Sequence, residues 1–270
     1  MTGPSRSHVV GLPELGGGWC QAVAVVSVSG SLARMKERTP LDYKELLRAG
    51  KWFRGLAEDF QDELLAAATL RRYVPGETVF TRGAPCLGLV GVLEGSIRVG
   101  GSNEAGEESI LVFAEPPTWF GEISIVDEGP MTHDARAERE SLTVFLTPES
   151  VQRVIAKKPE RWRDMGRLMA LKVRLLFTGM EELALLPVSA LVARRLVHMT
   201  EGYGGWEDRS ARVIEVSQEQ LATILAVSRQ TVNQVLKDLE ALKLVRTVYA
   251  GVEILDLSGL RRAAGRMLMP

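Results

Sequence analysis

Apolar residues in the C-terminal third of the chain recur with the period of an α-helix. Leu221, Ile224 and Leu225 share one face of a first segment. The apolar positions of a second segment also share one face, and they are Val232, Val235, Leu236 and Leu239. Because only a short interval around Ala226–Val227 separates the segments, the pattern predicts two short helices joined by a tight turn.

Polar residues around these segments indicate where the helices begin and what the second helix offers. Ser217 can cap the first helix, Gln220 completes a capping box three residues later, and Ser228 can cap the second helix. Candidate DNA contacts on and beside the second helix are Ser228, Arg229, Gln230, Thr231, Asn233, Gln234 and Lys237. This arrangement is typical of a helix-turn-helix, whose second helix enters the major groove. A plain helical hairpin with a solvated polar face would give the same pattern.

The segment 246–255 predicts two short strands around a turn that contains Gly251. A β-hairpin directly after a recognition helix is a wing, and it favours the DNA-binding interpretation over a plain helical hairpin. We expect Arg246 or Tyr249 to contact the DNA backbone from this wing.

The hydrophobic pattern before residue 187 predicts a different kind of domain. Apolar residues at helical spacing over 53–65 predict helical structure. Short β-like segments separated by glycines follow at 78–81, 87–93, 96–99, 109–113 and 142–146, and they predict a β-barrel or sandwich. The apolar positions of 161–186 cover more than one helical stripe, so this helix should pack against two neighbours. Pro187 ends it.

The composition limits the kinds of ligand and reaction that we expect for this chain. The 270 residues suffice for two domains. Because the net charge is only −1, affinity for DNA phosphate must come from a local patch of positive charge. That patch comprises Arg229, Lys237, Lys243 and Arg246. Cys20, Cys86 and the scattered histidines give no metal-ligand spacing, which favours a metal-free, cytoplasmic protein. Neither a nucleophile–base pair nor a phosphate-cradling loop is recognisable, so we expect no catalytic residues and no enzyme.

The N-terminal residues carry few structural signals. The apolar segment Ala22–Ser31 is too short for a membrane span and lacks the context of an export signal. We expect a flexible extension and no membrane partner. The alternative is that translation starts at Met35.

Four sequence motifs point to one protein family. The motifs S-R-x-T-V at Ser228–Val232 and L-x-x-L-E at Leu236–Glu240 lie in the C-terminal part. The other two are P-G-E-T-V-F-T-R-G at Pro75–Gly83 and L-E-G-S-I-R-V at Leu93–Val99. Together they resemble the cyclic-AMP receptor protein/Fnr (Crp/Fnr) family of bacterial transcription regulators, over roughly residues 52–262. The resemblance implies that Arg229, Gln230 and Gln234 face the bases.

Residues 119–135 resemble the phosphate-binding cassette of the same family. The effector contacts that this resemblance implies are Gly121, Glu122, Ser124 and Thr132, with Glu122 on the ribose hydroxyl. The family's phosphate-binding arginine is replaced by Met131. Losing such a desolvated charge contact typically removes about 2–5 kcal/mol. We therefore expect weak cyclic-nucleotide binding, a different effector, or a purely structural domain. Arg136 could substitute, although strand alternation could point it to either face.

These observations predict an α+β fold with an N-terminal cyclic-nucleotide-binding-type β-roll, a long dimerisation helix and a C-terminal winged helix-turn-helix. The expected divisions are an extension over 1–43, the β-roll over 44–158, the dimerisation helix over 159–186 and the DNA-binding domain over 187–270. A two-fold dimer would place its recognition helices about one DNA turn apart, which predicts a pseudo-palindromic site.

The predicted function is that of a homodimeric, sequence-specific transcription regulator with an effector-sensing β-roll. No cofactor is certain, and a cyclic nucleotide is one candidate effector. The expected partners are double-stranded DNA, a second copy of the chain and RNA polymerase. The alternative is a small-molecule or cyclic-nucleotide binding protein whose winged helix mediates protein contacts. Salt dependence separates the two, because DNA binding weakens steeply as salt rises.

Overall fold

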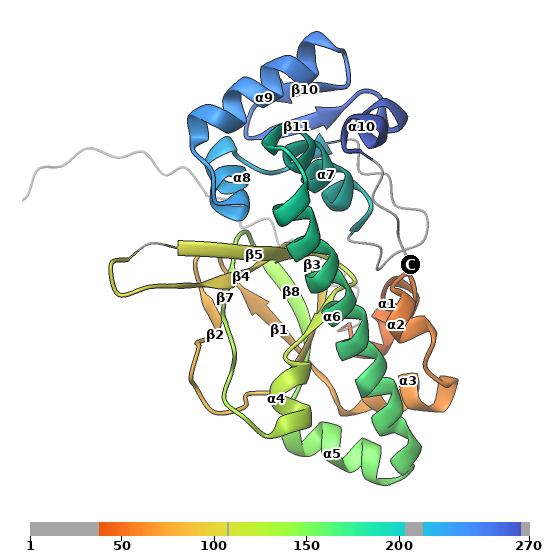
Figure 1. Cartoon of the computed structure of the whole chain (residues 1–270). Helices are drawn as coiled ribbons and strands as arrows, with labels where there is room; N and C mark the ends of the chain where they lie inside the picture. The colour runs from red at the N-terminus through yellow and green to blue at the C-terminus, as the bar shows by residue number, and fades with distance from the viewer. Residues whose placement is uncertain (1–37, 107, 203–212, 266–270) are drawn as a thin grey trace, which may run out of the picture. The chain divides into compact units, whose positions relative to one another are not determined.

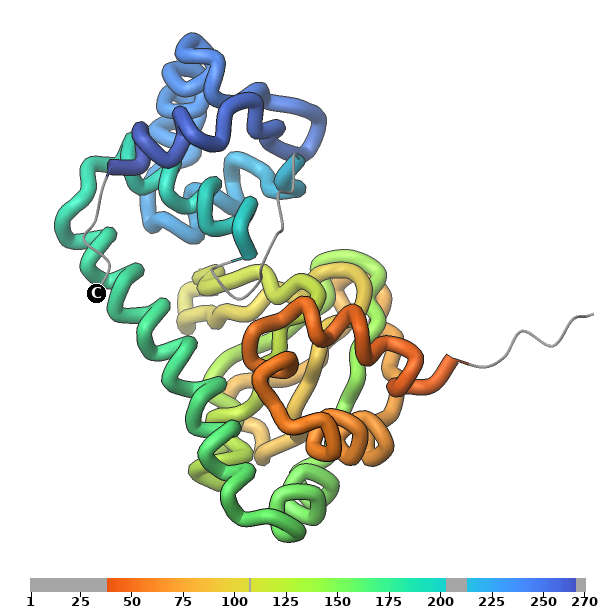
Figure 2. Tube along the Cα trace, turned by 90° about the vertical axis from the view of Figure 1, so that its right-hand side faces the viewer, coloured from red at the N-terminus to blue at the C-terminus, as the bar shows by residue number. Residues whose placement is uncertain are grey.

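The computed structural model describes residues 38–106, 108–202 and 213–265, and Figures 1 and 2 show the path of the chain. Most of the expected extension, including Met35, lies outside the described residues. The described chain opens with short helices, which are η1 (Pro40–Tyr43), α1 (Lys44–Arg48), α2 (Lys51–Arg54) and α3 (Glu58–Ala67). The helical structure predicted over 53–65 is therefore confirmed, and it is divided between α2 and α3. The helix is broken at Gly55–Leu56, where the Gln61 side chain donates to the carbonyl oxygens of Phe53 and Leu56, both at 3.0 Å.

Two four-stranded antiparallel sheets follow and form the β-roll (Figure 1). The first sheet, in spatial order, contains β1 (Thr69–Tyr73), β8 (Ser141–Leu146), β3 (Leu89–Glu94) and β6 (Trp119–Phe120). The second contains β2 (Thr78–Phe80), β7 (Asp134–Ala137), β4 (Ile97–Ser102) and β5 (Glu108–Ala114). The five expected strand regions are confirmed. The pattern missed β1, β6 and β7, because β1 is mostly exposed and polar, β6 is very short, and β7 has small inward residues.

Apolar side chains fill the roll and join it to the helices. One cluster in the roll includes Phe80, Phe120 and Met131. A second cluster joins the first sheet to the opening helices, to α5 (Pro148–Ala156) and to the start of the long helix. Within it the rings of Phe53 and Trp119 stack with centroids 5.6 Å apart. This packing places α4 (Glu122–Asp127), the helix of the expected cassette, beside the long helix.

The long helix α6 spans Trp162–Leu185, after the short η2 (Pro159–Arg161), and confirms the helix expected over 161–186 (Figure 2). One of its two expected neighbours is the β-roll, because Met165 and Leu168 are buried in the β-roll cluster. A second apolar stripe stays exposed and comprises Val173, Leu176, Phe177, Met180 and Leu183.

The C-terminal part is a helical domain with a three-stranded sheet, as expected for a winged helix. Its helices are α7 (Val188–Thr200), α8 (Gln218–Leu225), α9 (Arg229–Ala241) and α10 (Leu257–Ala263). The sheet, in spatial order, contains β10 (Val245–Val248), β11 (Gly251–Ile254) and β9 (Val213–Ile214). Its core forms from the faces predicted to be apolar, with Leu221, Val232 and Leu236 fully buried.

The predicted helix starts are confirmed by their hydrogen bonds. Ser217 Oγ accepts from the Gln220 amide at 3.1 Å, and Gln220 Oε1 accepts from the Ser217 amide at 2.8 Å, which completes the capping box. Ser228 Oγ accepts from the Thr231 amide at 3.0 Å. Between the two helices Ala226 adopts φ of 51°, in the left-handed region that ends a helix tightly.

Candidate DNA interface and effector cassette

The outer face of α9 is polar and its inner face is buried. Arg229, Gln230, Gln234 and Lys237 are exposed, whereas Thr231 and Asn233 are half-buried. Ser228, which caps the helix, is also exposed. Among the candidate contacts of the recognition helix, Gln230, Gln234 and Lys237 share one exposed stripe, and Arg229 and Asn233 lie on the neighbouring side that lines a pocket. Groups able to recognise guanine, adenine and phosphate lie together there.

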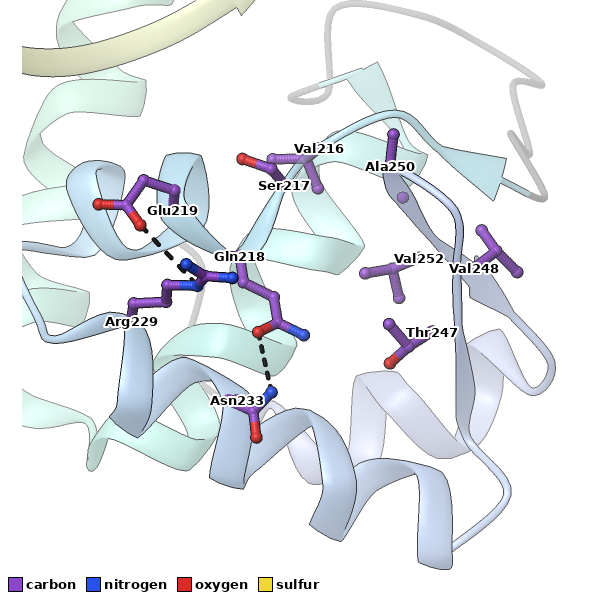
Figure 3. Close-up of a pocket in the computed structure, with 11 residues that line it drawn as sticks. Val216, Ser217, Gln218, Glu219, Arg229, Asn233, Thr247, Val248, Ala250 and Val252 are labelled. Carbon is purple, nitrogen blue, oxygen red and sulfur yellow. Dashed lines mark hydrogen bonds and ion pairs between the residues drawn. The ribbon is translucent and has the colours of Figure 1, made fainter.

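A pocket of about 610 Å³ lies between the start of α8, the side of α9 and the wing (Figure 3). Valine side chains from the segment before α8 and from the wing line part of it, and polar side chains from both helices line the rest. Asn233 Nδ2 donates to Gln218 Oε1 at 2.9 Å. Arg229 Nε lies 3.9 Å from Glu219 Oε2. The side of α9 that faces the wing is thus contacted by two residues of α8.

Both candidate backbone contacts, Arg246 and Tyr249, lie on the wing. Arg246 Nε donates to the Glu253 carboxylate at 2.9 Å across the hairpin, so its guanidinium is already paired. Tyr249, in the turn between β10 and β11, is fully exposed. The wing is joined to α9 because the Thr247 amide donates to Glu240 Oε1 at 3.1 Å. Of the two candidates on the wing, Tyr249 is the more accessible.

The cassette begins with a left-handed turn that requires glycine. Gly121 has φ of 95°, and a Cβ there would lie 2.2 Å from the carbonyl oxygen of Gly88. Ser124 Oγ donates to the Pro130 carbonyl at 3.0 Å, which closes the loop after α4. Thr132 is exposed and its hydroxyl lies 2.9 Å from His133 Nδ1. The pKa of His133 is lowered by burial and by the nearby Arg82 guanidinium.

The interior of the cassette is apolar where the resemblance would place an arginine. Met131 is buried in the same cluster as Phe80 and Phe120. Along β7 the residues Ala135 and Ala137 are buried while Arg136 is exposed. Strand alternation therefore turns Arg136 outward, where it lies opposite Arg98 of β4. Neither Met131 nor Arg136 supplies a positive charge to the interior.

Glu122 is the buried charge of the cassette, and its partner comes from the long helix. The Glu122 side chain is 2 % exposed, and its Oε2 accepts from Lys172 Nζ at 2.6 Å. Sequence reasoning missed Lys172, although a signal exists. Lys172 lies seven residues after Met165 and four after Leu168, so it shares the stripe of α6 that packs on the β-roll.

Sequence reasoning also missed the roles of Gln218 and Glu219, because their partners lie on a different helix. Their only sequence signal is their position in the first turn after the Ser217 cap. No group of three potential metal-binding side chains occurs in the described ranges. Within the same ranges, no helix is long and apolar enough to cross a membrane.

Two protein-family models match this architecture. Residues 70–158 match the cyclic nucleotide-binding domain, and residues 192–263 match the Crp-like helix-turn-helix domain. The chain belongs to the Crp/Fnr family. This Crp/Fnr protein is a transcription regulator that combines the family's two domains in one chain, as the sequence motifs predict.

Relatives of known function and solved structures agree with this assignment. The chain is 29% identical over 215 residues to the CRP-like cAMP-activated global transcriptional regulator of Mycobacterium tuberculosis, covering 78% of this chain and 96% of the relative. It is 29% identical over 201 residues to the transcriptional regulator LdrP of Thermus thermophilus, covering 74% and 98%. A CRP-family regulator from Thermus thermophilus has a similar structure, with a TM-score of 0.59 at 28% identity and coverage of 74% and 98%. FixK2 from Bradyrhizobium japonicum shares the fold, with a TM-score of 0.65 at 18% identity and coverage of 74% and 98%.

Proposed function

We propose that this Crp/Fnr protein regulates transcription by binding a pseudo-palindromic DNA site as a homodimer, without requiring cyclic AMP. The observation that carries the DNA-binding part is the polar face of α9, where Arg229, Gln230 and Gln234 are exposed opposite a buried apolar face. Arginine can bond to guanine through two hydrogen bonds, and glutamine can do so with adenine. Exposed Lys237 and Lys243 add charge for phosphate contacts.

The exposed stripe of α6 supports the homodimer. Its residues Val173, Leu176, Phe177, Met180 and Leu183 recur at helical spacing and are 43–65 % exposed. A contiguous apolar stripe of this kind is typical of a helix–helix interface. Pairing α6 with its copy about a two-fold axis would place two recognition helices on one face of DNA, about one turn apart.

A charge placed in this stripe tests the dimer. We expect the wild-type protein to have the solution mass of two chains in sedimentation experiments, and Phe177→Glu to have the mass of one. Val74→Glu is the matched control, because Val74 is 63 % exposed and lies between β1 and β2, away from α6. A wild-type mass of one chain at micromolar concentration would contradict the dimer.

Three features support independence from cyclic AMP. Met131 fills the interior of the cassette with an apolar side chain, Arg136 points outward, and the Glu122 carboxylate is already paired with Lys172. A cyclic phosphate would enter this interior without the arginine that the family's cassette supplies there, and a poorly paired buried charge is costly. Calorimetric titration with cyclic AMP should therefore show no binding at micromolar concentrations. Tight binding would contradict this part of the proposal.

The remaining parts of the proposal follow from family membership. The relatives are transcription regulators, which supports a cytoplasmic protein without a catalytic role and with RNA polymerase as a further partner. The alternative, a winged helix that mediates protein contacts, makes a different prediction. Specific DNA binding should weaken by orders of magnitude between low and high salt, because phosphate contacts release counterions. Fluorescence anisotropy with labelled genomic duplexes over a salt series measures this effect.

A further inference from the structure

A single hydrogen bond links the two helices of the helix-turn-helix on the side that faces the wing. Asn233, in the second turn of α9, donates through Nδ2 to Oε1 of Gln218, the first residue of α8, at 2.9 Å. Both side chains are half-buried and both line the pocket between the helices and the wing. Figure 3 shows the two side chains reaching toward each other across this pocket.

The recognition helix therefore presents two different polar stripes. Gln230, Gln234 and Lys237 form an outer stripe that is exposed. Arg229 and Asn233 lie one turn apart on a second stripe, and both line the pocket. On this second stripe each side chain is contacted by α8, through Glu219 and Gln218 respectively. On the outer stripe Gln234 Nε2 donates to Asp238 Oδ1 of the same helix at 2.9 Å, whereas the side chains of the second stripe are contacted by α8.

The constraint matters because an asparagine amide can present either a donor or an acceptor to a base edge. One amide hydrogen of Asn233 is used by Gln218, which leaves the other hydrogen and Oδ1 in fixed directions. Adenine is recognised by a donor and an acceptor together, and the wrong orientation of the amide reverses that pattern. The Gln218 carbonyl thus sets which hydrogen-bonding group Asn233 directs away from α8.

We propose that Gln218, although it lies outside the recognition helix, is a positioning residue that orients Asn233, so that the two residues together select the base at one position of the DNA site. This inference rests on the proposed DNA-binding function. It assigns part of the sequence preference to the first turn of α8. The fold does not depend on the contact, because the capping box at Ser217 and the buried faces of α8 and α9 hold the helices together.

The test is selection of binding sites from a randomised DNA pool by the full-length protein. Two variants each remove one partner of the hydrogen bond between these residues. Gln218→Met removes the acceptor, and Asn233→Ala removes the donor. We expect both to lose preference at the same base pair, by about 10-fold, with the other positions unchanged. The double variant should lose no more than either single variant, because the residues act as one unit.

Two further variants separate positioning from a structural role. Gln218→Glu keeps an acceptor for Asn233, so we expect it to retain the wild-type base preference while binding more weakly at low salt. Gln152→Met, on the exposed side of α5, is the matched control and should behave as the wild type. Thermal unfolding of every variant shows whether the fold is intact.

The outcomes distinguish this inference from the proposed function. If wild-type protein selects a defined site but Gln218→Met keeps the full preference, the inference is wrong. It is also wrong if Gln218→Met and Asn233→Ala change different positions, or weaken all positions equally. If the wild-type protein selects no site at all, the proposed DNA-binding function itself fails.

Discussion

The buried ion pair between Glu122 and Lys172 should contribute to the stability of the fold. Replacing Lys172 by methionine keeps the length of the side chain and its packing on the β-roll but removes the ammonium group. The Glu122 carboxylate, 2 % exposed and 2.6 Å from Nζ in the wild type, would then be buried without that partner. We therefore expect Lys172→Met to lower the free energy of unfolding.

The size of the effect depends on how well water replaces the lost partner. Breaking a fully buried ion pair by removing one side typically costs about 3–5 kcal/mol. The Lys172 side chain is 31 % exposed, so water can reach part of the site and the pair is partly screened. We expect a loss of about 1–3 kcal/mol. Adding Glu122→Gln should restore part of it, because a neutral amide is less costly to bury than a carboxylate.

Urea unfolding at neutral pH measures these differences. The matched control is Lys157→Met, which breaks an ion pair with Glu63 at 3.0 Å in which the lysine is 58 % exposed. Exposed pairs typically contribute about 0–1 kcal/mol, so the control should change stability little. If Lys172→Met and Lys157→Met destabilise the protein equally, or if Glu122→Gln adds to the loss, burial of Glu122 does not determine the effect of removing Lys172.

Three further predictions concern DNA contact, pH and the cassette. Arg229→Lys keeps the positive charge but loses the two-bond contact to guanine. In anisotropy titrations this variant should bind the selected site more weakly by about 1–3 kcal/mol, while its binding to a scrambled duplex should hardly change. Equal losses on both duplexes would contradict a base contact. Burial, with Arg195 and Arg194 nearby, lowers the pKa of His198 to about 4. As the pH drops, the unfolded chain therefore binds the proton before the folded chain does. The free energy of unfolding of the wild type should fall by up to about 3 kcal/mol between pH 6.5 and pH 4, and that of His198→Gln should fall less. Urea unfolding that gives the same pH dependence for both proteins would contradict this. Met131→Arg buries a charge that an anion can pair with, so cyclic AMP should raise the melting temperature of the variant but not of the wild type; no shift in the variant would show that Met131 does not block the site.

Local signals predicted the C-terminal domain well. Caps at Ser217 and Ser228 and the apolar faces of two adjacent helices are encoded within a few residues of one another. The structure reproduces these helices and the wing that follows them. The spacing alone also predicts that α6 has more than one apolar stripe, and the first of these stripes packs on the β-roll.

Contacts between distant residues could not be predicted in this way. Strand β1 pairs with β8, whose residues lie 68–76 positions further along the chain, and the sequence of β1 carries little apolar alternation. The Glu122–Lys172 pair joins residues 50 positions apart, and the bond between Gln218 and Asn233 spans 15 positions across a turn. The direction of Arg136 also depended on the register of β7, which the sequence left open.

Capture and sequencing of genomic fragments tests whether the protein binds a specific DNA site without cyclic AMP. Purified full-length protein is mixed with sheared genomic DNA in two parallel reactions, one with added cyclic AMP and one without. We expect the same pseudo-palindromic site to be enriched in both reactions. Enrichment that appears only with cyclic AMP would contradict independence from the nucleotide, and enrichment in neither reaction would contradict specific DNA binding by the protein alone.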